Sequence, residues 1–325
     1  MRNRIAAGLL AIGMIAPAAA QTCTPVQTPA VDIVSNRFYT DGAYSVPDPA
    51  LVEKRRVAMK PLEDFRADMT RYASRVLAGQ ATWARCLENG MAQWAEAGAM
   101  LGRLNEVQAH FERVWILSGL SIAYLNAKEA ISPERRPVIE SWLDRVAAET
   151  AKDLPARRKG GGNNHLYWLG FALGAAASAT GNARHWSLAR DVFRESVAHV
   201  EADGALPREM ARAGMASHYH AFSITPLVML AELAARRGED WYPQGNGALH
   251  RLAALVVKAG IEPQSLAQRA GAAQKPLARN NFGWLAFYAR RFPGRVPADR
   301  LLAGDDIWLP SAGGNLSLMA RRWVK

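Results

Sequence analysis

From about residue 50 onward, apolar side chains recur every three or four positions, the spacing that places them on one face of an α-helix. Connectors with helix stop and start signals, such as Gly79-Gln80 and Gly181-Asn182, separate these segments. No segment alternates apolar and polar residues as a half-buried strand does. The pattern predicts an all-α protein with helices over Leu51–Leu77, Trp83–Leu101, Val107–Leu125, Pro133–Val146, His165–Ala179, Ala183–Val200, Ala216–Ala235, Ala248–Ala259 and Pro276–Phe292.

Helices of similar length joined by short connectors favour stacked antiparallel hairpins, arranged as a solenoid or as a closed α/α toroid. Solenoids repeat a consensus of about 34 or 40 residues, and the sequence contains no such repeat, so a toroid is favoured. The chain has 325 residues, 50% of them apolar, and no Ser/Gly/Pro-rich linker divides it. We therefore expect one compact domain over residues 21–325.

The first twenty residues have a different pattern from the rest of the chain. Two arginines precede an apolar stretch from Ile5 to Ile15, and Pro17 with three alanines precedes Gln21. This order predicts a secretory signal peptide over residues 1–20, which is removed from the mature protein. The apolar stretch is shorter than the roughly 20 residues that a membrane-spanning helix needs. The mature chain is therefore expected in the periplasm, without a membrane partner.

Charge and cysteine content narrow the choice of partner and compartment. Loss of Arg2 and Arg4 with the signal lowers the net charge from +11 to +9. An exported basic protein meets little nucleic acid, so an anionic polymer is the expected partner, and a solubility charge is the alternative. Cys23 and Cys86 are the two cysteines, and an oxidising compartment favours a disulfide between them over two buried thiols.

Two polar clusters interrupt the apolar pattern. The first, at residues 160–168, has three glycines followed by Asn163, Asn164 and His165 at the start of an apolar helix. Asn163 fits an N-cap, whereas a second Asn and a His are harder to explain by capping. Residues 157–159, Arg-Arg-Lys, raise the local positive potential or form a solvated loop. The three glycines allow the backbone to come close to a ligand.

The second cluster runs from residue 206 to residue 220. Arg212 and Tyr219 are seven residues apart, which is two turns and one face of a continuous helix, although Gly214 can interrupt that helix. His218 and His220 flank Tyr219. Two histidines around one tyrosine, downstream of an arginine, favour a functional site over ordinary core packing.

Together these clusters resemble the family 5 polysaccharide lyases, the periplasmic alginate lyases. The matching motifs are Asn-Asn-His-x-Tyr-Trp at 163–168, Leu-Pro-x-Glu at 206–209, Arg212, Tyr219-His220, and Trp-Ala-Glu-Ala-Gly-Ala at 94–99. The resemblance covers residues 23 to 284 and implies an incomplete α/α toroid whose deep cleft holds an acidic polysaccharide. It assigns the catalytic roles to Asn164, His165, Arg212 and Tyr219, and it implies a mobile lid near residues 36–46.

These roles agree with the chemistry of β-elimination from a 1,4-linked uronate. An ionised carboxylate resists negative charge at C5, so Arg212 and the Asn164 amide would bind it and stabilise the enolate-like species. Tyr219 would act as base and acid where the C5 hydrogen and O4 share one side of the ring, as in mannuronate and glucuronate. His165 would polarise Tyr219, or take the proton from sugars of the opposite C5 configuration. No metal or other cofactor is needed.

The remaining candidates concern substrate binding and specificity. The candidate substrate-binding residues are Asn163, Trp168, Arg37, Tyr39, His218 and His220. The chain departs from the alginate lyase pattern at His218 and over residues 307–310, so the pocket is expected to differ. The first expected substrate is polymannuronate, with polyglucuronate or hyaluronan as further possibilities for a monomeric enzyme.

Two other functions compete with this one. A glycoside hydrolase on the same fold would use two opposed carboxylates, for which Glu209 and Asp203 are the nearest acids. Their placement beside Gly204 and Pro207 fits a turn better. A non-catalytic periplasmic protein that holds an acidic polysaccharide would keep the basic residues without needing the His/Tyr/Arg/Asn set.

Overall fold

The computed structural model describes residues 22–325, so the predicted signal peptide lies outside the described residues. Over this range the chain is almost entirely helical, as predicted. The helices are α1 (Pro49–Leu77), α2 (Ala84–Glu96), α3 (Val107–Ala127), α4 (Arg136–Ala151), α5 (Leu154–Arg158), α6 (Asn164–Thr180), α7 (Ala183–Ala198), α8 (Pro207–Met210), α9 (Ala216–Ala235), α10 (Gln244–Ile261), α11 (Ala267–Ala270), α12 (Gly283–Arg291), α13 (Asp299–Leu302) and α14 (Leu316–Trp323). Two short strands, β1 (Trp308–Leu309) and β2 (Gly314–Asn315), pair antiparallel.

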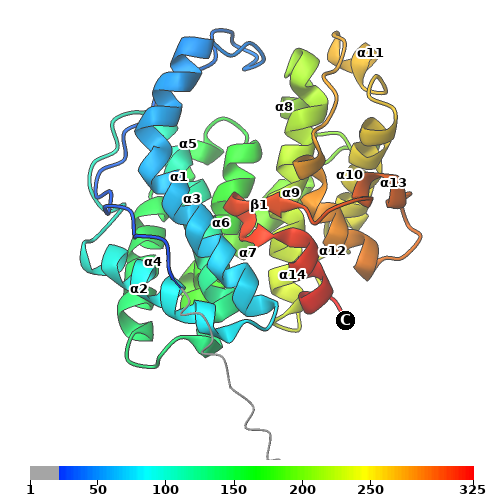
Figure 1. Cartoon of the computed structure of the whole chain (residues 1–325). Helices are drawn as coiled ribbons and strands as arrows, with labels where there is room; N and C mark the ends of the chain where they lie inside the picture. The colour runs from blue at the N-terminus through cyan, green and yellow to red at the C-terminus, as the bar shows by residue number, and fades with distance from the viewer. Residues whose placement is uncertain (1–21) are drawn as a thin grey trace, which may run out of the picture.

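The longer helices form an α/α toroid with an inner and an outer layer (Figure 1). Along the inner layer α1 packs on α3, α3 on α6, and α6 on α9, while α2, α4, α7 and α10 cover the outside. Nearly every residue of α6 is buried, and α9 is similarly buried, because these helices have neighbours on all sides. Helices α6 and α9 therefore carry apolar residues on all sides, whereas the outer helices have only one apolar face.

Two glycines of α6 allow this close packing. A Cβ at Gly170 would lie 2.5 Å from Val192 Cγ1 of α7, and one at Gly174 would lie 2.5 Å from Leu230 Cδ2 of α9. Any larger side chain would push the inner helix away from its neighbours. The two glycines thus set the separation of α6 from α7 and α9.

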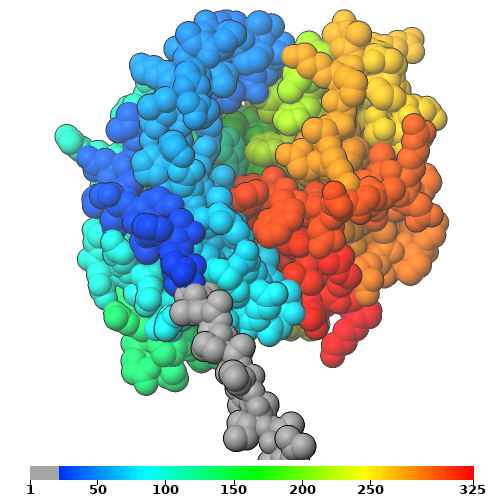
Figure 2. Space-filling model, viewed as in Figure 1, coloured from blue at the N-terminus to red at the C-terminus, as the bar shows by residue number. Residues whose placement is uncertain are grey.

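The toroid stays open on one side, where the space-filling view shows a hollow between the N-terminal and C-terminal halves (Figure 2). Helix α1 borders the hollow in one half, and α8 and α11 border it in the other (Figure 1). The C-terminal segment closes the ring below, since β2 packs on α1 and the 3-10 turn Pro310–Ala312 packs on α3. Among the described residues, no helix is both long enough and apolar enough to cross a bilayer.

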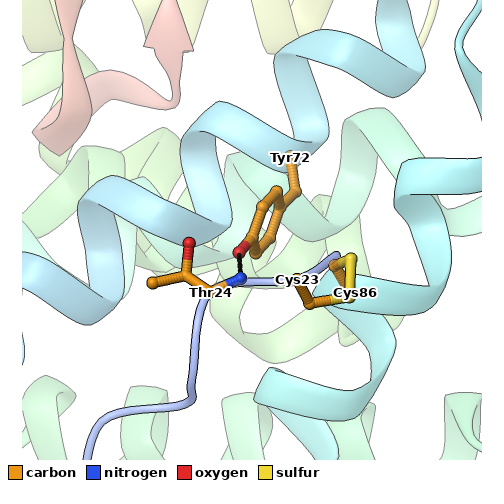
Figure 3. Close-up of a disulfide and its surroundings, with 4 residues drawn as sticks. All are labelled: Cys23, Thr24, Tyr72 and Cys86. Atoms are coloured by element: carbon orange, nitrogen blue, oxygen red, sulfur yellow. Dashed lines mark hydrogen bonds between the residues drawn. A yellow bond between two sulfur atoms is a disulfide. The ribbon is translucent and has the colours of Figure 1, made fainter. Parts of the chain in front are cut away.

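The segment that follows residue 21 is fastened along the outside of the first hairpin. Cys23 and Cys86 form the predicted disulfide, with 5.5 Å between their Cα atoms (Figure 3). Beside it the Thr24 amide donates a hydrogen bond to the Tyr72 hydroxyl at 2.8 Å. The Trp94 indole donates to the Gln27 carbonyl at 3.0 Å. These contacts tie the segment to α1 and α2 and fix where the chain enters residues 36–46.

Several predicted helix ends were wrong. The helix predicted over Trp83–Leu101 ends at Glu96, because Gly98 and Met100 have positive φ values of 65° and 63°. The helix predicted from Pro276 begins at Gly283, after a 3-10 turn at Arg279–Phe282. The short hairpin of β1 and β2 was not predicted, since two-residue strands carry no detectable alternation.

Candidate active site

Three inner helices begin at the same rim of the toroid, and their first turns line one pocket. The pocket has a volume of about 110 Å³ and receives side chains from α3, α6 and α9. A cavity of about 270 Å³ adjoins it on the side of residues 157–163, and another of about 440 Å³ adjoins it on the side of residues 275–281. Together they form a continuous cleft. Because helix N-termini carry partial positive charge, this rim favours an anionic ligand.

The first turn of α6 holds Asn163 and Asn164 in different roles. Asn163 caps the helix, and its Oδ1 accepts a hydrogen bond from the His165 amide at 3.0 Å. Asn164 is fully buried, and its Nδ2 donates to Oε1 of Glu209 at 3.0 Å. Its Oδ1 is buried beside the pocket without a hydrogen-bond partner among the described residues. Glu209 therefore orients the Asn164 amide before any substrate binds.

Glu209 lies beneath the cleft and also contacts the arginine of the site. It is fully buried, and its Oε2 lies 3.4 Å from Nε of Arg212. Burial raises the pKa of Glu209, while Asn164 and Arg212 act in the opposite direction. The carboxylate thus connects two of the four predicted catalytic residues. The sequence favoured a turn around Glu209, and the structure places Glu209 in the four-residue helix α8.

His165 lines the pocket with its ring stacked on Phe111, with 3.5 Å between the ring centroids. Burial lowers the pKa of His165 to about 3, and the nearby positive charges of Arg157 and Arg212 contribute to the shift. A histidine with this pKa is neutral at every pH above about 4. The imidazole is therefore uncharged when a substrate binds, with one ring nitrogen able to accept a proton.

Arg212 and Tyr219 meet at the pocket although the chain between them is not a continuous helix. The 3-10 turn Ala213–Met215 interrupts it, with a positive φ of 48° at Ala213. The Arg212 guanidinium carbon lies 4.8 Å from the centroid of the Tyr219 ring. Their predicted proximity is thus confirmed, but a bent connection produces it.

Tyr219 keeps its proton in the substrate-free cleft. Its side chain is only 8% exposed, and the hydroxyl donates a hydrogen bond to the Tyr44 carbonyl at 3.2 Å. Burial raises the pKa of Tyr219 far above its ordinary value, and the Tyr39 hydroxyl adds to this effect. Arg212 lowers the pKa by a smaller amount. In the free protein, burial thus outweighs the effect of the nearby Arg212 cation on the pKa of Tyr219.

The predicted lid segment, residues 36–46, leads into the start of α1 (Figure 1) and lines the pocket; its Tyr44 and Ser45 carbonyls accept hydrogen bonds from Tyr219 and Lys275 of the opposite half of the cleft. Arg37 donates to the carbonyls of Tyr39 and Asp41 at 2.9 and 2.8 Å, so its guanidinium mainly stabilises the lid itself. Tyr44 reaches farthest, since its ring lies 5.0 Å from the Arg212 guanidinium carbon. Arg37 and Tyr39 line the pocket, as expected for substrate-binding residues.

Two of the predicted substrate-binding residues do not reach the cleft. Trp168 is fully buried, and its indole donates to the Phe222 carbonyl at 3.0 Å. His220 is also fully buried: its Nε2 accepts from the Leu206 amide, and its Nδ1 lies 2.8 Å from the Ala216 carbonyl. Burial lowers the pKa of His220 to about 4. Both residues stabilise the fold, so their assignment to substrate binding was wrong.

His218 lines both the central pocket and the cavity on the side of residues 275–281. Its ring is nearly parallel to that of Phe222, with 6.2 Å between centroids. Burial, with a contribution from Lys275, lowers the pKa of His218. The neutral ring therefore offers a substrate a hydrogen-bonding edge and an apolar face.

The lining of the cleft is basic and contains no carboxylate. None of the residues that line these three cavities is Asp or Glu. Asp203 forms an ion pair with Arg269, and Glu209 is enclosed beneath the cleft. A pair of opposed acids, which hydrolysis of a glycoside requires, is therefore missing from the lining. Within residues 22–325, no three His, Cys, Asp or Glu residues gather closely enough to hold a metal ion.

Sequence reasoning missed Tyr44, Phe111, Trp115 and other residues that line the pocket, and it did not place Glu209 beneath it. Phe111 and Trp115 are four residues apart on α3, a spacing that also describes a core-facing pair. Tyr44 lies in a loop with φ of 57°, which no sequence pattern indicates. For Glu209, the Leu-Pro-x-Glu motif was a signal, but the motif did not reveal its partner.

Comparisons with known proteins agree with this geometry. A sequence model of the alginate lyase family matches residues 36–266. A polysaccharide lyase of Stenotrophomonas maltophilia (strain K279a) is 38% identical over 318 residues, which cover 96% of this chain and 95% of the relative. An alginate lyase of Azotobacter vinelandii is 32% identical over 264 residues, covering 77% of this chain and 70% of that protein.

Solved structures have the same fold. The match to the structure of alginate lyase A1-III from Sphingomonas species A1 covers 92% of this chain and 86% of that chain, with a TM-score of 0.76 and 25% sequence identity. A tyrosine-to-phenylalanine variant of alginate lyase A1-III, complexed with tetrasaccharide, covers 92% of this chain and 85% of its own, with a TM-score of 0.80 and 24% identity.

Proposed function

The chain belongs to the alginate lyase family and is a polysaccharide lyase, and from this premise we propose that it cleaves 1,4-linked polyuronates by β-elimination. Polymannuronate is the first substrate. Mannuronate and glucuronate share the configuration at C4 and C5, so polyglucuronate and hyaluronan fit the same reaction. The observation that carries the proposal is the convergence of Asn164, His165, Arg212 and Tyr219 on one cleft without lining acids.

We assign the substrate carboxylate to Arg212 and Asn164. A uronate carboxylate next to C5 opposes the negative charge that develops when the C5 proton leaves. The Arg212 guanidinium lies beside the Tyr219 ring, so a carboxylate bound there brings C5 and O4 within reach of the phenol oxygen. Charge stabilisation in a cleft that excludes water is stronger than in solvent, which lowers the barrier to proton removal.

Tyr219 is the group that moves protons in this scheme. In mannuronate the C5 hydrogen and O4 lie on the same side of the ring, so one oxygen can serve both atoms. The phenolate, formed when the phenol loses its proton to solvent, takes the C5 proton; the C5–H electron pair becomes the C4–C5 double bond, and the C4–O4 bond breaks. The same phenol then gives the proton to O4. The neutral His165 faces the same pocket and serves as base for sugars with the opposite C5 configuration.

One assay tests the reaction. The mature protein is mixed with polymannuronate, and ultraviolet absorbance is followed over time. Elimination creates a conjugated unsaturated uronate and raises the absorbance, whereas hydrolysis creates only new reducing ends. A polymer that is shortened without an absorbance rise would overturn elimination, and a polymer that stays intact would exclude it as a substrate.

We propose that the enzyme acts in the periplasm as a monomer. Support for the compartment comes from the signal-like residues 1–20 and from the disulfide, which persists only under oxidising conditions. Fractionation of the source cells and N-terminal sequencing test this, with a mature chain that starts at Gln21 as the expected result. Size-exclusion chromatography tests the oligomeric state.

A further inference from the structure

The cavity of about 270 Å³ beside the central pocket has an unusual charge. Three arginines line it, Arg157, Arg208 and Arg212, and no acid does. It shares His165 and Tyr44 with the central pocket, so a polymer bound across Tyr219 continues into it. Arg212 is already paired with a carboxylate, whereas the other two arginines have no assigned role.

Arg157 carries a charge that nearby acids do not neutralise by contact. Its guanidinium carbon lies 4.3 Å from the centroid of Phe111, and it forms no ion pair with a described residue. Asp153, the acid that acts on it electrostatically, already contacts His110 at 2.9 Å and Arg113 at 3.7 Å. Partial burial lowers the pKa of Arg157, as expected for a cation without an ion-pair partner.

Arg208 approaches the same cavity from α8. Its guanidinium lies over the glycine loop, where a Cβ at Gly161 would come within 3.4 Å of Nε. It has no hydrogen bond or ion pair with a described residue. Arg158, which follows Arg157 in the chain, is different, because Arg158 donates to Glu195 at 2.8 Å and does not line the cavity. Arg157 and Arg208 are thus two unpaired guanidinium groups that face one cavity.

We propose that Arg157 and Arg208 form an anion subsite that binds the carboxylate of the uronate next to the sugar undergoing elimination. Guanidinium groups bind carboxylates with two parallel, charge-assisted hydrogen bonds, and both arginines have their donors free. This inference rests on the proposed function, because it takes the bound polymer to be a polyuronate. It adds a determinant of substrate choice that none of the four catalytic residues supplies.

The other end of the cleft differs in chemistry. The cavity of about 440 Å³ contains a single cation, Lys275, together with Asn280, Asn281 and apolar side chains. Nζ of Lys275 donates to the Ser45 carbonyl at 3.4 Å, so part of its hydrogen-bonding capacity is used. The cleft is therefore selective for a charged sugar at the arginine end and accepts an uncharged one at the other.

Binding measured without turnover tests the subsite. Each variant is made in the Tyr219→Phe background, and titration calorimetry measures its affinity for tetramannuronate and for uncharged β-1,4-mannotetraose. Arg157→Gln and Arg208→Gln should each weaken tetramannuronate binding about tenfold, as loss of a charge-assisted contact predicts. Arg158→Gln removes the same charge from a neighbouring position and should change the affinity less than twofold. Mannotetraose affinity should be equal in all of these proteins.

The remaining outcomes separate this subsite from the proposed function. If Arg157→Gln and Arg208→Gln bind tetramannuronate as well as Arg158→Gln does, or if tetramannuronate does not bind at all, the subsite is overturned. An absorbance rise with wild-type protein would leave the lyase reaction standing in either case. If the wild-type protein produces no absorbance rise but Arg208→Gln weakens binding, the subsite stands and elimination fails. Arg208 is exposed, so its replacement should leave the fold intact.

Discussion

The carboxylate of Glu209 accepts hydrogen bonds from Asn164 at two donors, the backbone N at 2.7 Å and Nδ2, which lies 3.0 Å from Oε1 and 3.1 Å from Oε2. The first of these satisfies the leading amide of α6, and the second fixes the side chain of a proposed catalytic residue. Since Glu209 also contacts Arg212, a single buried carboxylate positions both groups that we assign to the substrate carboxylate. It acts through them and does not reach the pocket itself.

Replacing Glu209 by Gln should therefore reduce kcat more than it affects KM. The new side-chain NH₂ group would face Nδ2 of Asn164 and Nε of Arg212, so donors would oppose donors and both residues would turn away. We expect kcat on polymannuronate to fall at least tenfold, while KM changes less, because loss of the carboxylate that competes for Arg212 offsets part of the lost substrate binding. The free energy of unfolding should fall by about 1–3 kcal/mol, the cost of a buried unsatisfied group.

The matched control for this variant is Glu195→Gln, which removes a carboxylate that pairs with Arg158 away from the cleft. Its kinetic constants should stay within twofold of wild type. Equal kinetic constants for Glu209→Gln and wild type would show that Glu209 does not position the site. A rise in KM with kcat unchanged would indicate a role in substrate binding alone.

Replacing Tyr219 by Phe should abolish elimination without unfolding the protein. The phenol oxygen is the proposed base and acid, and proton transfer by a positioned group contributes about 10²–10⁴-fold to the rate. The phenylalanine loses only contacts with the lid segment, namely the hydrogen bond to the Tyr44 carbonyl at 3.2 Å and the interaction with the Tyr39 hydroxyl, so the melting temperature should change little. Tyr124→Phe is the control, because that hydroxyl donates to Glu140 outside the cleft. Retained activity in Tyr219→Phe would remove Tyr219 from the mechanism.

The features that the sequence predicted are those that depend on local pattern. Helical periodicity located the main helices because the outer helices have one apolar face. The inner helices are longer apolar stretches, and stop and start signals separate them. The Asn-His pair and the Arg/Tyr pair were found because polar residues interrupt otherwise apolar segments. Their meeting in one cleft followed from the family resemblance, since residues 164 and 219 come from different helices.

The features that it did not predict depend on contacts between distant segments. Glu209 and Asn164 are 45 residues apart, and nothing in either local sequence indicates that they meet. Trp168 and His220 belong to the motifs, but the structure places both side chains in the core. A family motif includes residues needed for packing as well as residues needed for catalysis, so membership in the motif did not distinguish the two. The pKa of Tyr219 likewise depends on burial beneath the lid segment, which the composition of the loop does not determine.

The pH dependence of the reaction should identify the base. Because burial raises the pKa of Tyr219 above its ordinary value near 10, the phenolate fraction increases tenfold per pH unit across the working range. We therefore expect log kcat/KM on polymannuronate to rise with a slope of about +1 between pH 5 and pH 9. His165, with a pKa of about 3, is already neutral and adds no limb there. Initial rates at constant ionic strength measure this, and a flat profile would instead assign the base to His165.

Removal of the disulfide should lower stability more than activity. The Cys23–Cys86 bond closes a loop with a sequence separation of 63, and loop closure of this size contributes about 4 kcal/mol to stability. The neighbouring segment keeps its hydrogen bonds to Tyr72, Asp68 and Trp94, so the lid segment should stay in position at room temperature.

Denaturant unfolding of the double variant Cys23→Ser/Cys86→Ser, compared with wild type, measures this loss. Adding dithiothreitol should destabilise wild type to the level of the variant and leave the variant unchanged, which controls for other effects of the reductant. Polymannuronate turnover at 25 °C should stay within about twofold of wild type, because the loss of chain entropy acts mainly on the unfolded state. A stability loss below about 1 kcal/mol would mean that the hydrogen bonds alone hold the segment.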